Sequence, residues 1–430
     1  MRFLGIGDSA DLGALYLHLV EDGHDVKIHI ADPLCRGTLA GLVEHVDDWE
    51  AELDWIRAAG DEGFLLFENV GAGRGEQQDR LRREGFNVIG SSAFGARLEN
   101  ERSYAQQVLA GLGLTTPQVW EFTDSQAACR FMAERPARYV FKGNGPDDPT
   151  YVGIHDQAED LKALLTLKRP RSPSFILMEF IDGVEMGVGA YFNGEVFLEP
   201  ACLDWEHKRF FPGDLGELTG EMGTVVTYSR SRRFFDLTLR KLEPLLKEEG
   251  YCGYINLNTI VNEDGIWPLE FTCRFGYPGF AILAALQRTG WAELFQMMVT
   301  RSGCRFNVEP GFAVGVVITT PPFPYSRANV AEPVGLPILF DKTLTTADRS
   351  HLHYGELGLK DGALVTSGSY GYTMVATGLG ATVAEARDAA NALAKKVLVP
   401  NARYRRDIGD RVIARDLARV EALGLLDEGD

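Results

Sequence analysis

Within the first hundred residues, short apolar runs alternate with stretches of helical periodicity. Strands are expected over residues 2–6, 25–30, 63–67 and 86–89, each separated from the next by residues with a helical or turn pattern. Consecutive strands that are separated by helices pair in parallel, because a parallel connection needs a long crossover. Residues 1–97 are therefore predicted to form a doubly wound α/β domain built on a parallel sheet.

The rest of the chain follows a different pattern, in which helices alternate with longer strands that read as antiparallel hairpins. Helices are expected at 98–112, 125–134 and 233–249, and one of the longer strands at 195–203. A chain of 430 residues is too long for a single hydrophobic core. We expect an α+β body at 98–310 with a small mobile subdomain at about 115–183. A C-terminal α+β domain is expected over 311–430, closing with an amphipathic helix at 383–397. The fold class predicted is thus a multidomain mixture of α/β and α+β parts.

The charge balance restricts the partners of the protein. There are 43 basic and 61 acidic residues, which gives a net charge of −18. Such a surface repels nucleic acid and anionic membranes, so neither is expected as a partner. The six cysteines are scattered without a CxxC pair, and no apolar run approaches the roughly 20 residues of a membrane span. We expect a soluble, cytoplasmic protein that is a monomer or a homodimer.

Residues 266–274 read IWPLEFTCR and are expected to form a strand. Because side chains alternate along a strand, Glu270 and Thr272 share one face, which Arg274 continues, while Phe271 and Cys273 lie on the other. A carboxylate and a hydroxyl beside a guanidinium suit a magnesium site next to an anion-binding arginine. The spacing is equally typical of an exposed edge strand with an ion pair, and alone it leaves both interpretations open.

Five segments resemble motifs of the phosphoribosylamine–glycine ligase family, whose members have the ATP-grasp fold. They occur in the family's order along nearly the whole chain, at residues 92–104, 178–185, 204–223, 269–279 and 404–409. The most specific is LEFTCRFGYPG at 269–279, which is similar to the family's EFNCRFGDPE signature. The resemblance implies an ATP-grasp fold with an N-terminal pre-ATP-grasp domain, and a ligase that forms an amide through an acyl phosphate with release of ADP and phosphate.

The resemblance also implies roles for particular residues. ATP is expected to contact Arg102, Lys142, Glu179, Phe180, Ile181, Glu185, Gly220 and Gly223. Mg²⁺, or Mn²⁺ in its place, is expected on Glu270 and Thr272. Substrate or phosphate contacts during catalysis are expected from Arg274, Lys208 and Arg209, the last two forming a basic trio with His207. The substrates would be a small carboxylate, glycine or another amino acid, and an amine.

The sequence also departs from the family at several of these places. Asp8 and Asp11 stand where the family has a glycine- and arginine-containing turn that holds the phosphate of its amine substrate. Two aspartates would repel phosphate, so an altered second substrate is expected. Thr272 replaces the family's asparagine, Tyr277 replaces an acid, and the lid after Lys142 has lost its second lysine.

Three alternatives to this reading stay open on the sequence alone. One is a genuine phosphoribosylamine–glycine ligase with a rebuilt phosphate site, and another is a catalytically silent relative that binds nucleotide. A minor one is a zinc hydrolase that uses His351 and His353, which share a face of an expected strand but have no evident third ligand nearby.

Overall fold

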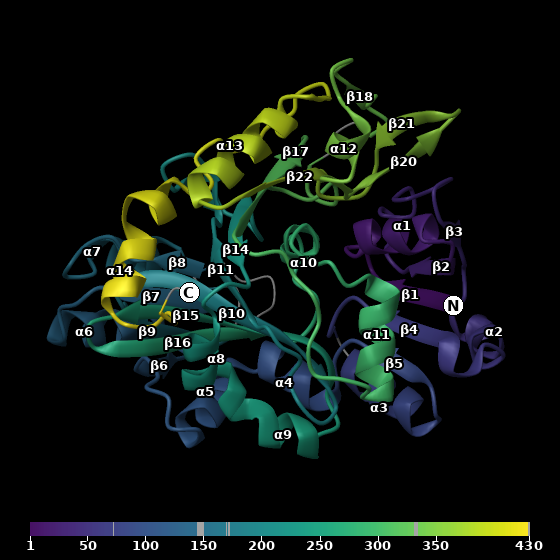
Figure 1. Cartoon of the computed structure of the whole chain (residues 1–430). Helices are drawn as coiled ribbons and strands as arrows, with labels where there is room; N and C mark the ends of the chain where they lie inside the picture. The colour runs from purple at the N-terminus through teal and green to yellow at the C-terminus, as the bar shows by residue number, and fades with distance from the viewer. Residues whose placement is uncertain (72, 144–149, 169, 171–172, 331–333, 429–430) are drawn as a thin grey trace. The chain divides into compact units, whose positions relative to one another are not determined.

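The structure, a computed structural model, divides the chain into two compact units (Figure 1). The larger unit comprises Met1–Glu101, Met186–Asn258 and Phe271–Asp430, and the smaller unit comprises Arg102–Glu185 and Thr259–Glu270. The described residues are 1–430 apart from 72, 144–149, 169, 171–172, 331–333 and 429–430. The part of the predicted lid at 144–149 therefore lies outside the described residues.

The N-terminal part of the larger unit is a five-stranded parallel sheet with the strand order β3-β2-β1-β4-β5. Its strands are β1 (Arg2–Gly7), β2 (Asp25–Ile30), β3 (Glu44–His45), β4 (Gly63–Phe67) and β5 (Asn87–Ile89). The order reverses at β1, because β2 pairs on one side of this strand and β4 on the other. This arrangement confirms the predicted doubly wound α/β domain.

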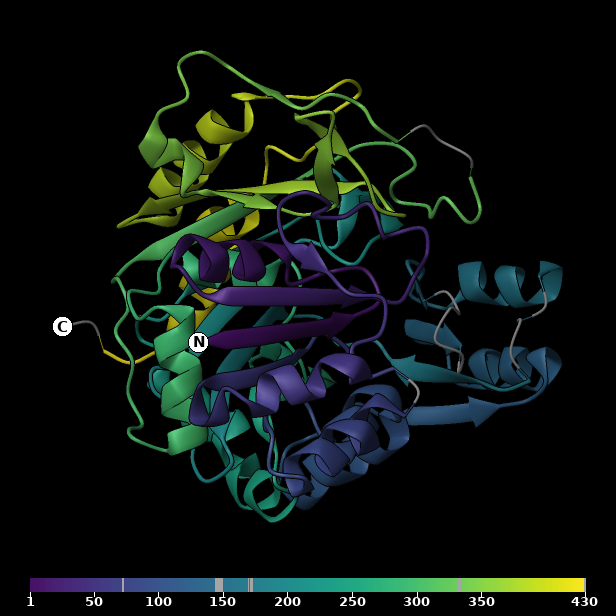
Figure 2. The same ribbon diagram turned by 90° about the vertical axis from the view of Figure 1, so that its right-hand side faces the viewer.

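Both faces of this sheet are covered by helices, as Figure 2 shows. On β1, Phe3 belongs to one hydrophobic cluster, which reaches α1 (Gly13–Glu21) and α11 (Trp291–Thr300), while Leu4 belongs to a second cluster on the opposite face. The second cluster lies under α2 (Leu53–Arg57) and α3 (Arg74–Arg83). Since both faces are largely apolar, we expect the ligand-binding groups of this domain at the strand ends and in the loops.

The larger unit also contains a row of six antiparallel strands in the order β10-β11-β14-β17-β22-β19, which belong to an eight-stranded sheet completed by β15 (Cys252–Asn262) and β16 (Gly265–Thr272). The strands of this row are β10 (Val184–Asn193), β11 (Cys202–Glu206), β14 (Gly223–Thr227), β17 (Phe312–Thr319), β19 (Leu352–Tyr354) and β22 (Tyr372–Gly380). Helix α13 (Val383–Ala394) packs directly on β22 and β17. A Cβ at Gly378 would lie 2.2 Å from the backbone nitrogen of Ala390, so only glycine allows this close packing.

The smaller unit is built on a four-stranded antiparallel sheet with the order β6-β9-β7-β8. The strands are β6 (Val119–Phe122), β7 (Tyr139–Gly143), β8 (Thr150–Val152) and β9 (Phe175–Glu179). Helices α6 (Ser125–Glu134) and α7 (Glu159–Leu167) close its hydrophobic core, and α5 (Arg102–Gly111) opens the unit. The Asp124 carboxylate caps α6 by accepting hydrogen bonds from the backbone N–H groups of Gln126 and Ala127.

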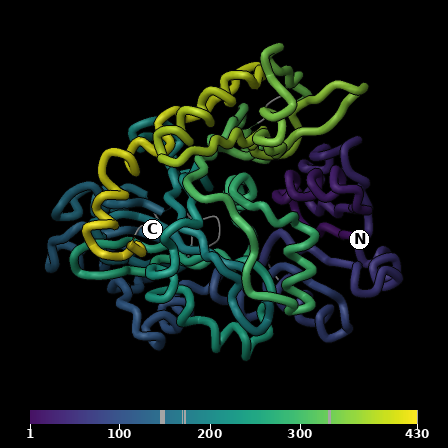
Figure 3. The backbone as a smooth tube through the Cα atoms, viewed as in Figure 1, coloured from purple at the N-terminus to yellow at the C-terminus, as the bar shows by residue number. Residues whose placement is uncertain are grey.

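Figure 3 traces the chain through the remaining elements. The hairpin strands β15 (Cys252–Asn262) and β16 (Gly265–Thr272) each contribute residues to both units. The other helices are α4 (Ala93–Asn100), α8 (Arg232–Leu237), α9 (Glu243–Glu248), α10 (Gly279–Ala284), α12 (Thr346–Arg349) and α14 (Leu417–Ala422). The other strands are β12 (Arg209–Phe211), β13 (Leu215–Leu218), β18 (Leu339–Phe340), β20 (Leu357–Lys360), β21 (Ala363–Thr366) and β23 (Val397–Leu398). No described helix has both the length and the apolar content that crossing a membrane requires.

Three elements differ from the sequence-based expectation. The strand expected at 195–203 does not form over that range, and β11 begins at Cys202, because Pro200 has no N–H to donate to a strand ladder. The helix expected at 233–249 is divided into shorter pieces at Thr238, whose φ of −126° and ψ of −97° are not helical. The helix expected at 98–112 is likewise split at Glu101, between α4 and α5. The three consecutive domains, 1–97, 98–310 and 311–430, stay a prediction.

The C-terminal segment is anchored by one buried guanidinium. Arg405 is 1% exposed and donates to both carboxylate oxygens of Asp407 at 2.9 and 2.8 Å. It also donates to the Asp214 carboxylate at 3.0 Å and to the backbone oxygen of Arg209 at 2.9 Å. The planar guanidinium donates to three different residues and so holds the turn that precedes α14 against β12 and the loop after it. A lysine ammonium could not make this set of hydrogen bonds, because it lacks the planar arrangement of donors.

We expect Arg405→Ala to lower the free energy of unfolding by about 3 kcal/mol, because four hydrogen bonds and a buried side chain are lost together. Urea unfolding followed by fluorescence measures this change. The matched control is Arg406→Ala, because Arg406 is the neighbouring residue and its side chain is exposed. This variant should change the free energy of unfolding by less than about 0.5 kcal/mol. Equal effects of the two variants would contradict the anchoring role.

Candidate functional site

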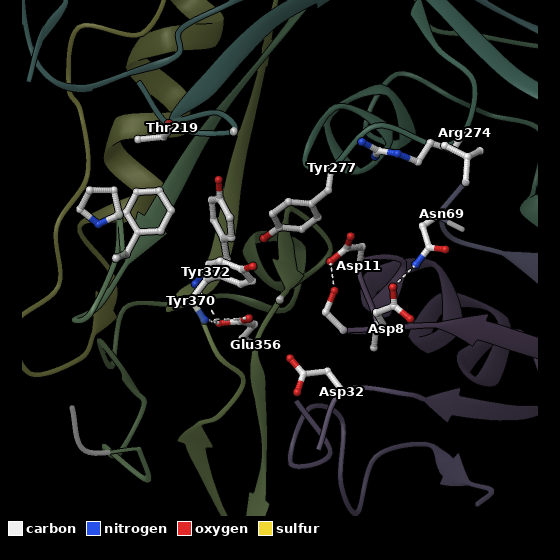
Figure 4. A pocket seen from close by; sticks show the side chains of 18 of the residues that line it. Asp8, Asp11, Asp32, Asn69, Thr219, Arg274, Tyr277, Glu356, Tyr370 and Tyr372 are labelled. Atoms are coloured by element: carbon white, nitrogen blue, oxygen red, sulfur yellow. Dashed lines mark hydrogen bonds between the residues drawn. The ribbon is translucent and has the colours of Figure 1, made fainter. Parts of the chain in front are cut away.

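A cavity of about 610 Å³ opens at the carboxyl ends of β1, β2 and β4, and all of its lining residues belong to the larger unit (Figure 4). The segment from Asp8 to Asp11 follows β1, Asp32 follows β2, and Asn69 follows β4. The loops after β1 and β4 flank the point where the strand order reverses. Open parallel sheets bind their ligands at this position, since two loops diverge there and leave a crevice.

Carboxylates from both predicted aspartates lie in this cavity. The Asp8 carboxylate accepts hydrogen bonds from Arg74 and from the Asn69 amide, both at 2.7 Å. The Asp11 carboxylate accepts a hydrogen bond from the Ser9 hydroxyl at 2.7 Å. Both Asp8 and Asp11 therefore line a cavity that could hold a ligand.

The loop that carries Asp11 is held in place by a buried acid, Glu68, which is 3% exposed. Its carboxyl group accepts hydrogen bonds from the Tyr16 hydroxyl at 2.7 Å and from the Asp11 N–H at 3.1 Å. A Cβ at Gly7 would lie 1.8 Å from a Glu68 oxygen, so this position requires glycine. Burial, together with the nearby charge of Asp11, raises the pKa of Glu68 to about 8.

Arg274 lines the same cavity but is already paired with an acid. Its Nε donates to the carboxylate of Glu99, on α4, at 3.0 Å, and the other Glu99 oxygen accepts the Cys273 N–H at 2.7 Å. The residue therefore reaches the cavity, as predicted for a substrate contact, although part of its charge is neutralised. Tyr277, at the position of the family's acid, also lines the cavity, and its hydroxyl is buried without a hydrogen-bond partner among the described residues.

Glu356 brings a further carboxylate to the cavity from the C-terminal segment. It is 6% exposed and accepts hydrogen bonds from the backbone N–H groups of Ser369, Tyr370, Gly371 and Tyr372. Burial raises the pKa of Glu356 to about 7, although the hydrogen bonds from the backbone N–H groups act in the opposite direction and lower it. Sequence analysis missed this residue, as it missed Asp32 and Glu99, because no local motif marks a side chain that reaches the cavity from a distant element.

The predicted nucleotide contacts fall mainly in the smaller unit. These are Arg102 at the start of α5, Lys142 on β7, Glu179 at the end of β9, Phe180, Ile181 and Glu185. Lys142 is 9% exposed, and the Nη1 atom of Arg102 is buried without an acceptor among the described residues. The Arg138 guanidinium lies 3.6 Å from the centre of the Phe180 ring, which fixes this side chain after β9.

The other predicted basic and glycine positions lie in the larger unit. Lys208 forms an ion pair with Glu206 at 3.0 Å, and Arg209 donates to the backbone oxygen of Gly216 at 2.7 Å. Gly220 lines the cavity. Gly223 instead lies within β14, where a Cβ would come within 2.3 Å of the Gly315 oxygen, so packing alone accounts for this glycine. Its predicted nucleotide contact stays a prediction.

His207, the first residue of the basic trio, is neutral and structural. It is 1% exposed, its Nε2 accepts the Gly409 N–H at 3.2 Å, and its Nδ1 lies 3.2 Å from the Trp205 oxygen. Burial and the charges of Arg411 and Arg405 lower the pKa of His207 to about 4. Two segments that the sequence singled out separately, around 207 and around 409, therefore pack against each other.

The predicted metal-binding pair lies on β16, where Glu270 and Thr272 are half-buried and Phe271 between them is 3% exposed. Among the described residues, no three His, Cys, Asp or Glu side chains form a group that could hold a metal ion. A single carboxylate with a neighbouring hydroxyl suits Mg²⁺, which takes most of its remaining ligands from phosphates and water.

His351 and His353, considered for zinc, both lie within hydrogen-bond distance of the Thr377 hydroxyl, at 3.3 and 3.1 Å. Burial, then the neighbouring His18 and His351, lowers the pKa of His353 to about 3. These contacts are those of neutral histidines packed beside β22.

Comparison with known proteins identifies the relationship. Residues 100–280 match the family described as phosphoribosylglycinamide synthetase, ATP-grasp (A) domain. This segment is thus similar to the ATP-grasp domain of that family. A phosphoribosylamine–glycine ligase of Pseudomonas aeruginosa is 27% identical, with 97% of this chain and 99% of that protein covered. The corresponding ligase of Halalkalibacterium halodurans is 26% identical over 78% of this chain and 79% of its own length. The predicted resemblance is thereby confirmed, at low identity.

Solved structures give the same fold. The phosphoribosylamine–glycine ligase of Thermotoga maritima superposes with a TM-score of 0.72 at 22% identity, covering 95% of this chain and all of that one. A biotin carboxylase of Campylobacter jejuni, in complex with an ATP analogue, superposes with a TM-score of 0.62 at 11% identity and 98% coverage of both chains. The predicted ATP-grasp fold is confirmed by these neighbours.

Glu68 gives a pH-dependent prediction. A carboxyl group with a raised pKa keeps its proton in the folded state, while the unfolded chain releases it above pH 4.5. Unfolding then releases a proton between pH 4.5 and about 8, so the free energy of unfolding falls as pH rises through this window. Glu68→Gln mimics the protonated acid. The free energy of unfolding of this variant should therefore fall less steeply with pH, by up to about 1.4 kcal/mol per pH unit.

Urea unfolding at pH 5, 6, 7 and 8 measures this slope for both proteins. The matched control is Glu62→Gln, which alters an exposed carboxylate at the start of β4 and should leave the slope unchanged. An unchanged slope in Glu68→Gln would show that this carboxylate is ionised in the folded protein.

Proposed function

We propose that this protein is an ATP-dependent ligase that joins a small carboxylate to an amine through an acyl phosphate. The observation that carries the proposal is the family match over residues 100–280, which contains most of the predicted nucleotide-binding positions. The relatives that match nearly the whole chain are phosphoribosylamine–glycine ligases. The orphaned buried donor of Arg102 supports an anionic ligand in the smaller unit.

The chemistry requires two transfers. A carboxylate oxygen attacks the γ-phosphorus of ATP, which forms an acyl phosphate and releases ADP. A neutral amine then attacks the acyl carbon, so that the C–N bond forms, the C–O bond to the phosphoryl group breaks, phosphate leaves and the nitrogen loses a proton. Both transfers build negative charge on phosphoryl oxygens, and fixed cations stabilise that charge most effectively.

The residues proposed for these tasks are distributed along the chain. Arg102 and Lys142 hold the ATP phosphates, the segment from Glu179 to Ile181 meets the adenine, and Glu185 binds the ribose. Lys208, Arg209 and Arg274 contact the phosphate and carboxylate groups. Gly220 and Gly223 are proposed to let the backbone approach the nucleotide.

Glu270 and Thr272 would hold Mg²⁺, or Mn²⁺ in its place. A bound divalent ion supplies charge neutralisation at the phosphates. Glu270 would orient the ion through one carboxylate, and the remaining ligands would come from the nucleotide and water.

The substrates are proposed to be glycine or another amino acid together with an amine, in a cytoplasmic protein that is a monomer or a homodimer. A genuine phosphoribosylamine–glycine ligase is the second candidate, which the names of the matching relatives favour. A silent nucleotide-binding relative is the third, and it would release no ADP with any substrate pair.

We expect ADP release to require both a carboxylate and an amine, and Glu270→Gln to lower the rate at least about 100-fold, because the substitution removes the proposed metal-binding charge at nearly constant volume. Trapping with hydroxylamine tests the first transfer separately, since an acyl phosphate gives a coloured hydroxamate with iron. The matched control is Asp264→Asn, at the exposed turn of the same hairpin, which should keep wild-type activity.

Thermal unfolding of Glu270→Gln should match that of the wild type, which separates loss of metal binding from loss of fold. Retained activity in a folded Glu270→Gln protein would contradict the metal assignment. If no carboxylate tried gives a hydroxamate although the protein still binds ATP, the silent nucleotide-binding relative would be favoured.

A further inference from the structure

The cavity at the end of the parallel sheet carries an unusual excess of negative charge. Five carboxylates line it, from Asp8, Asp11, Asp32, Glu99 and Glu356, and they face a single guanidinium, that of Arg274. Figure 4 shows side chains from the N-terminal domain and from the C-terminal segment pointing toward one common space.

Two of these five charges are neutralised within the protein. Glu99 pairs with Arg274 at 3.0 Å, and Asp8 pairs with Arg74 at 2.7 Å. The other three, from Asp11, Asp32 and Glu356, form no ion pair with another residue in the described parts of the chain. Their polar contacts are a hydroxyl, a thiol and backbone N–H groups, which share hydrogen bonds but supply no positive charge.

The uncharged part of the lining also suits a cation. The aromatic rings of Tyr277, Tyr370, Tyr372 and Phe323 line the cavity. The rings of Tyr277 and Tyr372 meet at 5.2 Å and those of Phe323 and Tyr372 at 4.6 Å, so they form a continuous wall. Aromatic faces attract ammonium groups, so this wall suits a cationic ligand.

The buried hydroxyl of Tyr277 is a second observation that points to a ligand. It has no hydrogen-bond partner among the described residues, and in Figure 4 it points into the space between Asp11 and Glu356. Buried polar atoms are almost always satisfied, so a hydroxyl left free inside a cavity indicates a partner that the ligand supplies.

We propose that this cavity binds an amine substrate that carries a second positive charge, such as a diamine or an amino sugar with an additional amine, and that it rejects phosphorylated amines. The inference rests on the proposed ligase function and specifies its amine. The reacting nitrogen is neutral and attacks the acyl phosphate as described above. The second ammonium group takes no part in bond making and is held by the carboxylates of Asp11 and Asp32, against the tyrosine wall.

A phosphate group is the opposite case. Its two negative charges would meet the unpaired carboxylates of Asp11 and Asp32, and the guanidinium of Arg274 is already shared with Glu99. Phosphate sites in proteins are usually built from several N–H donors and basic side chains. Asp8 and Asp11 occupy the loop after β1 where such donors would be needed.

Matched probes test this inference in the full-length protein. Isothermal titration at low ionic strength compares 1,4-diaminobutane with 1-aminobutane, and glucosamine with glucosamine 6-phosphate. We expect the diamine to bind at least about ten-fold more tightly than the monoamine, and glucosamine to bind more tightly than its phosphate ester. Asp11→Asn should weaken diamine binding about five-fold. It should also reduce the ratio between the affinities for glucosamine and glucosamine 6-phosphate.

The matched control is Asp22→Asn, which removes one exposed charge from the same domain at the opposite end of the sheet and should change neither affinity. Tighter binding of glucosamine 6-phosphate, no advantage of the diamine, or an unchanged affinity in Asp11→Asn would each overturn the inference. Hydroxamate formation does not depend on the amine, so it reports on the proposed function separately. If hydroxamate forms while the phosphate ester binds better, the ligase proposal survives and only the cationic amine is excluded.

Discussion

The reversal of strand order at β1 is the constraint on which the candidate site depends. Because both faces of the parallel sheet are packed against apolar clusters, the loops that follow the strands are the natural place for a ligand site. Glu68 reinforces this geometry, since it follows β4 and accepts a hydrogen bond from the loop that follows β1. The acid therefore ties together the two loops that diverge at the reversal, and the cavity lies between them.

Charge is distributed unevenly over this framework. The larger unit presents a cavity rich in carboxylates, whereas the smaller unit holds Arg102 and Lys142, which are the proposed contacts of the ATP phosphates. In a chain with a net charge of −18, such local cations are needed to bind a triphosphate at all. The resemblance to the ligase family predicts the two basic contacts, whereas the acidic cavity contains Asp8 and Asp11, at which the sequence departs from that family.

Much of the fold could be predicted because its signals are local. The parallel strands follow from apolar runs, and helix 125–134 was placed at its observed bounds. The breaks at Pro200 and Thr238 were missed, since apolar periodicity gave no warning of either. The site was harder to predict, because Asp32, Glu99 and Glu356 come from separate elements and meet only when the chain has folded. Asp8 and Asp11 could be predicted as site residues only because the turn after β1 aligns with the phosphate-binding turn of the family that the sequence resembles. Packing within β14 already requires a glycine at Gly223, so its presence does not by itself indicate a ligand contact.

The central claim is that ATP activates a carboxylate by phosphorylating it. Incubation of the enzyme with ATP, Mg²⁺, an amine and glycine labelled with ¹⁸O in its carboxylate tests this claim most directly, with the released phosphate analysed by mass spectrometry. Our account predicts one ¹⁸O atom in each phosphate released, because the carboxylate oxygen that attacks phosphorus stays with it when the amine displaces phosphate. Phosphate without label, released together with ADP and amide, would contradict an acyl phosphate intermediate.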